Sequence, residues 1–500
     1  MSNLVGIDLG TTYSAIAQLD ETGRPVMIAN KDGDNIMPSI VLFESKTDVI
    51  VGKEAMKFYG LSQNVFGRFK REMGTDKVYE AFGKKYNPTA LSSFVLSKIK
   101  DDAEASIGKI TQAVVTIPAN FATEAREATL SAAKSSGLKI KNIINEPTAA
   151  AIYYAFTSGD PLSGIYAVYD LGGGTFDISI IRVEGSDIQV INTDGVHKLG
   201  GRDFDDILIE IVQKKYKKKT GKELITEDYT QNQAEDTKKT LSTREKATVR
   251  ITSTRTTIEV TREEFEAAIS TLIVQAEITC ENCLDDKDLS SDDIIQVILA
   301  GGSTRMPCIQ KSVKKIFKKE PKTFGNPDEA VALGAALFVA YKADPSTLNP
   351  LQRKAVSQVN ISDVSSKFFG TSVLVKDSET AKMITINDTV IKKGEKLPCS
   401  VMKEYFTAHD NQTGVNCDVT ESNVEESDPD FVKNIWEGVL ELPEGRPAGQ
   451  QIDVTFSYSE NQIMKCSFLD VHSKNKTDID LTIDNEGSRS EIDINDFKVD

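Results

Sequence analysis

The stretch Ala167-Val-Tyr-Asp-Leu-Gly-Gly-Gly-Thr-Phe-Asp-Ile-Ser-Ile-Ile181 is the strongest indication of the fold. It repeats the pattern of a second stretch near the start of the chain, Leu4-Val-Gly-Ile-Asp-Leu-Gly-Thr-Thr-Tyr-Ser-Ala-Ile16. Each copy has an apolar run, then Asp-Leu-Gly, then small or hydroxylated residues, then a second apolar run. The apolar runs are typical of buried strands, and the glycines are typical of a turn where φ is positive or the backbone approaches a ligand. We therefore expect two related hairpins, one in each of two lobes.

The turn of each hairpin has the composition of an anion site. Backbone N–H groups of glycine and threonine in such a turn form a concavity suited to phosphate, and Asp8 and Asp170 at the strand ends suit a hydrated Mg²⁺ ion. The alternative is an ordinary tight turn, which glycine marks in many proteins. Two copies with the same strand-like flanks favour the site, so we predict one nucleotide clamped between the two lobes.

The composition limits the class of protein. The 500 residues carry a formal net charge of −16, and nucleic-acid or anionic-membrane surfaces are normally basic, so neither partner is expected. No apolar run approaches the ~20 residues of a membrane span, and no secretory signal is recognisable before the first predicted strand. The six cysteines are too sparse for a disulfide scaffold. We therefore expect about three domains and a cytoplasmic location.

Cysteine and histidine chemistry is not favoured. Cys280 and Cys283 form a C-x-x-C pair on one face of a predicted helix over residues 264–284, but no second pair or neighbouring histidine completes a metal site. The chain has three histidines, which stand alone and do not assemble a Ser/His/Asp triad.

Three further positions are candidates for chemistry. Lys70 lies in Phe66-Gly-Arg-Phe-Lys-Arg71, and by composition alone a solvated lysine is expected there. Glu146 ends a predicted strand just before a helix that starts at Pro147, a place equally common for catalytic carboxylates and for simple helix starts. A strand over residues 294–300 runs into a third glycine turn, which leaves Arg305 free to lie against an aromatic base. Helices are predicted over 91–105, 123–133, 231–242 and 328–341, one strand over 113–118, and two strands over 248–260.

The chain resembles the seventy-kilodalton heat-shock chaperones of DnaK type, within the actin-like ATPase superfamily. The resemblance covers the first 341 residues in the family's order and rests on six segments: Gly6-Ile-Asp-Leu-Gly-Thr-Thr12, Ile144-Asn-Glu-Pro-Thr-Ala-Ala-Ala151, Asp170-Leu-Gly-Gly-Gly-Thr-Phe-Asp177, Leu199-Gly-Gly-Arg-Asp-Phe-Asp205, Gly301-Gly-Ser-Thr-Arg-Met-Pro307 and Asn326-Pro-Asp-Glu-Ala-Val-Ala332. It implies a two-lobed, ribonuclease H-like ATPase domain over residues 1–343 that binds ATP or ADP with Mg²⁺, with K⁺ as a further candidate ion.

The resemblance also supplies roles for single residues. Asp8 and Asp170 resemble the residues that hold Mg²⁺ through water, and the catalytic set is Lys70, Glu146, Thr175 and Asp177. Positioning and charge neutralisation by so few groups suffice for phosphoryl transfer. The nucleotide-binding set is Gly10, Thr11, Thr12, Tyr13, Gly172, Gly173, Gly174, Thr175, Gly200, Gly201, Glu235, Lys238, Lys239, Ser242, Gly301, Gly302, Ser303, Arg305 and Asp328. Pro118 and Arg126 resemble the proline switch and the arginine that couple hydrolysis to the substrate domain.

The rest of the chain is similar to the family's peptide-binding part. Residues 344–366 are expected to be a linker, and residues 367–484 alternate as short strands separated by turns, which predicts a β-sandwich. Extended or unfolded polypeptides are the implied clients, held between its loops. Residues 485–500 are expected to be an acidic tail. No segment after Ser457 has the periodicity of a long helix, so we expect no helical lid and rapid peptide release in both nucleotide states.

Several residues depart from the family. The linker Gln358-Val-Asn-Ile-Ser-Asp363 is more polar than usual, so weaker docking on the ATPase domain is expected. The resemblance implies two classes of partner, J-domain co-chaperones and nucleotide-exchange factors. Asn142 replaces an arginine that in the family helps bind J-domain partners, so the J-domain class is less well supported. Lys239 replaces a stacking arginine, and Arg202 stands where the family has a glutamate.

Three functions are compatible with these residues. The first is an ATP-hydrolysing chaperone, since every nucleotide-site group is present. The second is a co-chaperone or adaptor that holds ATP as a structural ligand and lacks a peptide clamp. The third is a sugar kinase or a filament-forming actin relative, against which the β-sandwich argues.

Overall fold

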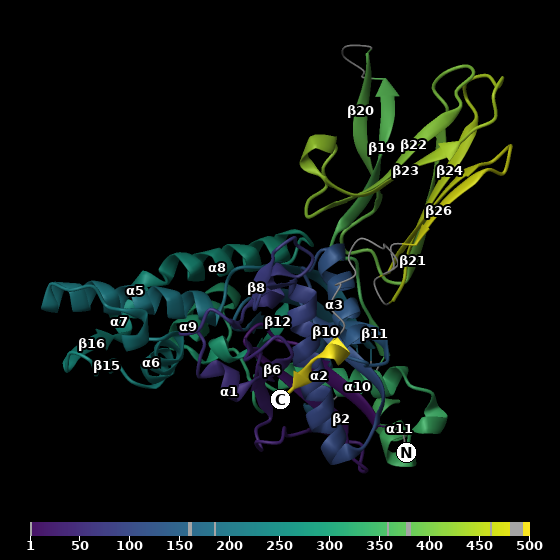
Figure 1. The fold of residues 1–500 in the computed structure, drawn as a ribbon. Coiled ribbons are helices and arrows are strands. Elements are labelled where there is room, and N and C mark those ends of the chain that lie inside the picture. The colour runs from purple at the N-terminus through teal and green to yellow at the C-terminus, as the bar shows by residue number, and fades with distance from the viewer. Residues whose placement is uncertain are drawn as a thin grey trace. The chain divides into compact units, whose positions relative to one another are not determined.

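The computed structural model describes residues 3–158, 163–184, 187–357, 360–376, 382–460, 463–480 and 494–500. The chain forms two compact units: unit 1 comprises Met1–Ile361 with Ser488–Asp500, and unit 2 comprises Ser362–Gly487. Unit 1 is mixed α/β, and the described part of unit 2 is all β apart from one 3-10 helix (Figure 1). An α/β part followed by a β part is the predicted order.

The first sheet of unit 1 contains the hairpin nearest the start of the chain. Its strands are β1 (Asn3–Asp8), β2 (Tyr13–Leu19), β3 (Pro25–Met27), β4 (Ile36–Pro38), β10 (Ile110–Ile117) and β11 (Ile140–Asn145). The strand order is β11-β10-β1-β2-β3, and β4 pairs with β2. β1 runs antiparallel to β2 and parallel to β10, and α2 (Pro88–Ile107) and α3 (Thr123–Ser135) pack against β10.

The second sheet repeats this arrangement around the other hairpin. Its strands are β12 (Ser163–Leu171), β13 (Phe176–Glu184), β14 (Asp187–Val196), β17 (Ile294–Ala300) and β18 (Asn360–Ser362), in the order β17-β12-β13-β14-β18. β12 runs antiparallel to β13 and parallel to β17, as β1 does to β2 and β10. Each sheet has its own apolar core.

Two apolar helices, α4 (Glu146–Thr157) and α10 (Ala330–Lys342), pack against each other and against the strands of both hairpins. A Cβ on Gly334 of α10 would lie 1.8 Å from the carbonyl oxygen of Ala149, and a Cβ on Gly6 of β1 would lie 2.2 Å from the backbone N of Ala336. Only glycine permits such close backbone contact. These helices therefore fix the carboxyl ends of β1 and β12 beside each other.

The remaining elements of unit 1 surround this centre. α5, α6, α7 and the β15–β16 hairpin lie together in one part of the unit (Figure 1), and β5, β6, β7 and β27 form a small separate sheet. The bounds are α1 (Lys53–Met56), α5 (Gly201–Thr220), α6 (Gln231–Thr243), α7 (Arg262–Ala268), α8 (Ser270–Asp285), α9 (Pro307–Phe317), α11 (Pro350–Val356), β5 (Val41–Phe43), β6 (Asp48–Val51), β7 (Val65–Phe66), β8 (Tyr79–Ala81), β9 (Lys84–Tyr86), β15 (Lys246–Ile251), β16 (Thr256–Thr261) and β27 (Lys498–Val499), with 3-10 helices η1 (Phe69–Glu72), η2 (Thr226–Asp228), η3 (Gly302–Arg305), η4 (Pro345–Thr347) and η6 (Ile494–Asp496).

Unit 2 is built from two four-stranded antiparallel sheets that share one core. The first has the order β20-β19-β22-β23 and the second the order β21-β24-β25-β26. Side chains of the central strand β24 alternate between partly exposed and buried, as a sandwich requires. The elements are β19 (Phe368–Lys376), β20 (Met383–Ile391), β21 (Cys399–Phe406), β22 (Gly414–Ser422), η5 (Pro429–Phe431), β23 (Lys433–Glu441), β24 (Gln451–Tyr458), β25 (Met464–Asp470) and β26 (Lys476–Asp480).

Three expectations are corrected. The helix over 264–284 is two helices, because Ile269 leaves helical geometry (φ −90°, ψ 1°) and is fully buried. The segment 344–366, expected to be a linker, is partly folded. Gln352 of α11 donates hydrogen bonds to Leu19 O and Asp20 O, and residues 360–362 of the segment form β18. Gln358 and Val359 lie outside the described residues. The acidic tail ends in ordered structure, because residues 494–500 pack on unit 1, while 485–493 lie outside the described residues.

No helix of the described residues is long and apolar enough to cross a membrane. After Ser457, the described residues form strands and a short 3-10 helix, and α-helix is absent from these described parts.

Candidate functional site

The two hairpins bring a cluster of buried carboxylates together. Asp8 ends β1 and accepts a hydrogen bond of 3.0 Å from Thr116 Oγ1 on β10. Asp170 lies opposite Asp177 in the β12–β13 register, and Asp177 Oδ1 accepts a 3.3 Å bond from the backbone N–H of Asn120. The strand ends therefore deliver three aspartates to one place, as the repeated Asp-Leu-Gly pattern predicts for Asp8 and Asp170.

Lys70 and Glu146 form a buried ion pair next to these aspartates. Lys70 Nζ lies 2.5 Å from Glu146 Oε1, and the side chains are 3% and 10% exposed. Lys70 lies on η1, and Glu146 is the first residue of α4. The solvated-surface interpretation of Lys70 is therefore wrong. The lysine is held in place by its neighbours, since Arg68 pairs with Asp206 and Arg71 pairs with Asp203, both on α5.

The carboxylates hold more negative charge than their surroundings neutralise. Burial, and then the neighbouring Glu146, raises the pKa of Asp8 to about 7 and that of Asp177 to about 7. The same two causes raise the pKa of Asp170 well above its usual range. In all three aspartates the positive charge of Lys70 opposes this rise in pKa without cancelling it. Clustered oxygen ligands with excess negative charge suit a hard divalent cation such as Mg²⁺. Within the described residues, no three His, Cys, Asp or Glu side chains converge enough to ligate a metal ion directly.

The glycine loops of the two hairpins touch each other. A Cβ on Gly173 would lie 1.8 Å from Thr12 Oγ1, and a Cβ on Gly174 would lie 2.3 Å from Thr11 Cγ2. Close approach is therefore the reason for glycine here. Positive φ, which the sequence also suggested, occurs at Gly301 (φ 78°) in the third turn.

A small cavity of about 80 Å³ lies between the loops and the carboxylates. Thr12 Oγ1 is buried at this place with no hydrogen-bond partner, which leaves an unsatisfied polar atom facing the loops. The predicted residues that line the cavity are Asp8, Gly10, Thr11, Thr12, Tyr13, Lys70, Glu146, Asp170, Gly172, Gly173, Gly174, Thr175, Gly301, Gly302 and Asp328.

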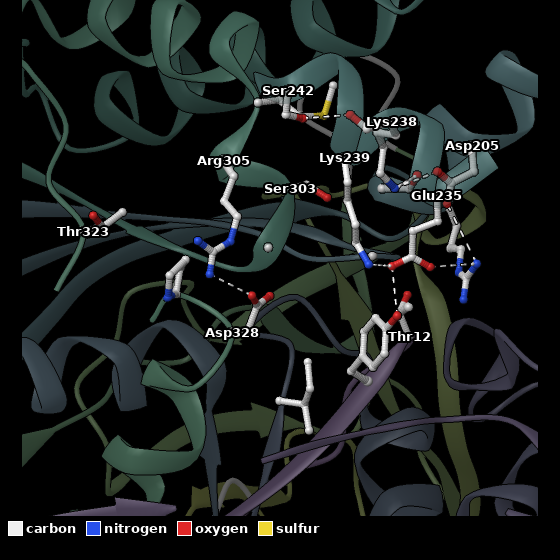
Figure 2. A pocket seen from close by; sticks show the side chains of 18 of the residues that line it. Thr12, Asp205, Glu235, Lys238, Lys239, Ser242, Ser303, Arg305, Thr323 and Asp328 are labelled. Carbon is white, nitrogen blue, oxygen red and sulfur yellow. Dashed lines mark hydrogen bonds and ion pairs between the residues drawn. The ribbon is translucent and has the colours of Figure 1, made fainter. Parts of the chain in front are cut away.

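A larger cavity of about 610 Å³ adjoins the small one, because Thr12, Tyr13, Gly173, Gly302, Pro327 and Asp328 line both. Figure 2 shows side chains of α6 on one side of it and Arg305 with Asp328 on the other. The predicted Gly201, Glu235, Lys238, Lys239, Ser242, Ser303 and Arg305 also line it. Gly200 adjoins the glycine loop, since a Cβ there would lie 2.5 Å from the backbone N of Gly174. The structure thus gathers the predicted nucleotide residues around two connected cavities.

The first turn of helix α6 fixes where the helix begins beside this cavity. Thr230 and Gln233 form a capping box, which fixes the start of the helix. Glu235, one turn further on, accepts a 2.9 Å hydrogen bond from Tyr13 OH and pairs with Lys239 at 2.9 Å. The sequence suggested that Arg305 is free, but the structure corrects this. Arg305 pairs with Asp328 at 3.0 Å and contacts Asn326.

Arg202 and Asp205 are cavity residues that the sequence did not assign to the site. Arg202 is 2% exposed and its Nη1 lies 3.5 Å from Glu235 Oε2, while Asp205 is fully buried and pairs with Lys238 at 2.7 Å. Burial opposes ionisation of Glu235, but Arg202 and then Lys239 outweigh it and lower the pKa of that carboxyl. The signal available in the sequence was the arginine in place of a glutamate at position 202.

The predicted coupling residues lie next to the carboxylate cluster. Arg126 of α3 donates to Phe121 O (3.0 Å) and Ala119 O (3.1 Å), and so holds the segment that follows Pro118 at the end of β10. The same segment contains Asn120, which bonds Asp177. Cys280 and Cys283, in contrast, are buried in the core of the second sheet, and burial raises the pKa of the Cys280 thiol well above its usual range.

Unit 2 has a cavity of its own, of about 850 Å³. Three of its apolar lining residues are unusually exposed: Leu374 (53%), Phe406 (60%) and Val439 (56%). Phe406 and Ala408, which both line the cavity, lie within residues 367–484, the part of the chain that resembles the family's peptide-binding domain. Exposed apolar side chains around a concavity are typical of a binding site.

The chain thus has a mixed α/β unit with two connected cavities, followed by a β-sandwich with a cavity of its own. A family model described as Hsp70 protein matches residues 4–82 and 77–497. The chain therefore belongs to the Hsp70 family. Members of this family are ATPases that use ATP and ADP with Mg²⁺ and bind unfolded client polypeptides and co-chaperones.

Proposed function

We propose that this chain hydrolyses Mg²⁺-ATP in unit 1 and uses the change of nucleotide state to bind and release extended polypeptide in unit 2. The observation that carries the proposal is the cluster of four carboxylates and one lysine at the small cavity, which Asp8, Lys70, Glu146 and Asp170 line. Phosphoryl transfer requires mainly positioning and neutralisation of charge, and this cluster offers both.

The small cavity is proposed to hold the phosphates. Backbone N–H groups of Gly10–Tyr13 and Gly172–Thr175 would bind phosphate oxygens, and Asp8 and Asp170 would hold Mg²⁺ through its water ligands. A bound Mg²⁺ ion supplies neutralisation of the phosphate charge. The ammonium group of Lys70 would place a further positive charge beside the terminal phosphate. Glu146 and Asp177 would orient the attacking water by accepting its hydrogen bonds.

The larger cavity is proposed to hold adenosine. Its volume of about 610 Å³ lies within the usual range for ligand pockets. Glu235, whose carboxylate is kept ionised by Arg202 and Lys239, is suited to accept hydrogen bonds from ribose hydroxyls. Arg305 is held by Asp328 at the opposite wall, where its flat guanidinium group suits stacking on the base.

The cavity of the sandwich is proposed to hold the client. Leu374, Phe406 and Val439 offer apolar surface to alternate side chains of an extended peptide, while backbone groups of the adjoining strands and loops supply hydrogen bonds. Pro118 and Arg126 are proposed to couple the two sites, because the segment they hold contacts Asp177. J-domain co-chaperones and nucleotide-exchange factors are the corresponding proposed partners, and a cytoplasmic location is proposed with them.

The test measures hydrolysis and peptide affinity on the same protein. The expected result is turnover of Mg²⁺-ATP, together with rapid release of an extended apolar peptide in both nucleotide states and a small difference in peptide affinity between ATP and ADP. Nucleotide binding without turnover and without peptide binding would overturn the proposal in favour of the adaptor alternative. Membership of the Hsp70 family leaves the sugar-kinase and filament alternatives without support.

A further inference from the structure

The segment Ile494–Asp500 completes a sheet of unit 1. Its strand β27 runs parallel to β6, with Lys498 opposite Asp48 and Val499 opposite Val49. Three backbone hydrogen bonds fasten it: Lys498 N to Thr47 O (2.8 Å), Asp500 N to Val49 O (2.9 Å) and Val51 N to Asp500 O (2.8 Å). The sheet order is β27-β6-β5-β7, so β6 is the edge strand whenever β27 is absent.

One aromatic side chain anchors the segment. The ring centroid of Phe497 lies 5.2 Å from that of Phe94, 6.3 Å from that of Tyr86 and 6.4 Å from that of Phe43, all in edge-to-face geometry. Lys84 Nζ lies 4.7 Å from the centre of the same ring. Phe497 therefore packs, partly buried, in an aromatic pocket at the edge of the first core of unit 1.

The other side chains of the segment also match their surroundings. Ile494 is buried in the same core, and Phe497 and Val499 alternate with exposed Lys498 and Asp500, as in a half-buried strand. Asp500, which accepts a hydrogen bond from Lys498, raises the pKa of that lysine most, and the carboxylates of Asp48 and Glu44 raise it further. Apolar anchors and charges thus both fit one register.

We propose that the edge of β6, with the pocket formed by Phe43, Tyr86 and Phe94, is a peptide-docking site of unit 1, and that the chain's own segment Ile494–Asp500 is its occupant. The site recognises an extended segment in which an aromatic residue is followed by Lys, an aliphatic residue and Asp. Addition of such a segment to a sheet edge gives affinity through backbone bonds and specificity through the side-chain pocket. An uncovered β6 would present unpaired backbone groups between buried valines, which is a liability that this segment removes.

Docking in cis has a consequence for the whole chain. Unit 1 contains residues on both sides of unit 2 in the sequence, so the sandwich is attached to unit 1 through both of its ends. Release of the Ile494–Asp500 segment removes one of the two attachments. This site is separate from both the nucleotide cavities and the cavity of the sandwich, and its test does not depend on ATP hydrolysis.

The test uses the full chain, a variant that lacks residues 494–500, and a fluorescent peptide of residues 491–500. Anisotropy should show that the peptide binds the deletion variant. The peptide should bind the full chain at least tenfold more weakly, because the tethered segment competes at an effective concentration on the order of millimolar. A peptide with Phe497→Ala should bind at least tenfold more weakly, and a scrambled peptide should not bind. Failure of the peptide to bind a natively folded deletion variant, or equal binding to the full chain, overturns the proposal.

A second variant keeps the test decisive if the deletion prevents folding. The full chain with Phe497→Ala should bind the wild-type peptide more tightly than the wild-type chain does, whereas Phe431→Ala, at a 75% exposed phenylalanine of unit 2, should not. Equal behaviour of the two variants overturns the proposal. A dimer of the wild-type chain that light scattering finds dissociated in the deletion variant would assign the occupant to a second copy and overturn docking in cis.

Discussion

Lys70→Ala is expected to remove the positive charge that lies among four buried carboxylates. Lys70 Nζ lies 2.5 Å from Glu146 Oε1, and Lys70 also lowers the pKa of Asp8, Asp170 and Asp177. Breaking a buried pair by removing one partner costs about 3–5 kcal/mol of folding stability, because the other charge stays buried and unpaired. A clear fall in the melting temperature of the nucleotide-free protein is therefore expected.

The same substitution should slow ATP hydrolysis. Loss of one preorganised group that stabilises developing charge costs about 2.7–4 kcal/mol of the barrier, or 10²–10³-fold in rate. Nucleotide affinity should change far less, because the cavity of about 610 Å³ proposed for adenosine does not include Lys70. Single-turnover hydrolysis of Mg²⁺-ATP measures the first effect, and calorimetric titration with ADP measures the second.

A double variant separates charge repair from catalysis. Lys70→Ala with Glu146→Gln removes the unpaired carboxylate, so it should regain much of the stability but none of the hydrolysis. Lys98→Ala with Lys31→Ala is the control outside the site, since Lys98 and Lys31 lie 3.0 Å and 3.3 Å from the buried Asp102. A wild-type rate of hydrolysis in Lys70→Ala, or in the double variant, would refute the reasoning.

Three further predictions concern the other sites. Burial raises the pKa of Asp8 from 3.8 to about 7, so the nucleotide-free native state binds a proton that the unfolded chain releases, and its stability falls as pH rises from about 4 through about 7. Asp8→Asn should accordingly raise the melting temperature at pH 8 while it reduces hydrolysis more than tenfold, and a lower melting temperature would contradict this. Gly173→Ala puts a methyl group 1.8 Å from Thr12 Oγ1, so titration should show ADP affinity reduced at least tenfold, and unchanged affinity would mean that the loops separate freely. Leu374→Asp in the cavity of the sandwich should weaken binding of an extended apolar peptide at least tenfold, whereas Met402→Asp, equally exposed (54%) but outside the cavity, should leave anisotropy titrations unchanged.

Local patterns in the sequence predicted much of the site. The repeated Asp-Leu-Gly hairpins fixed where Asp8 and Asp170 stand, because a strand followed by a glycine turn is specified by neighbouring residues. The state of Lys70 was not readable in this way, since its burial depends on Glu146, Arg68 and α5, which are distant in sequence. The pairing of Arg202 with Glu235 was missed for the same reason.

The class of each unit and the order of the motifs can be read from the sequence, because hydrophobic periodicity and turn residues act over a few neighbouring positions. Tertiary structure alone decided which charges are buried together, and hence why the pKa of Asp177 rises to about 7. It also decided the fate of Ile494–Asp500. The alternation of Phe497, Lys498, Val499 and Asp500 permits a strand, but composition marks an acidic tail, and only the aromatic pocket beside β6 supplies the burial that orders it.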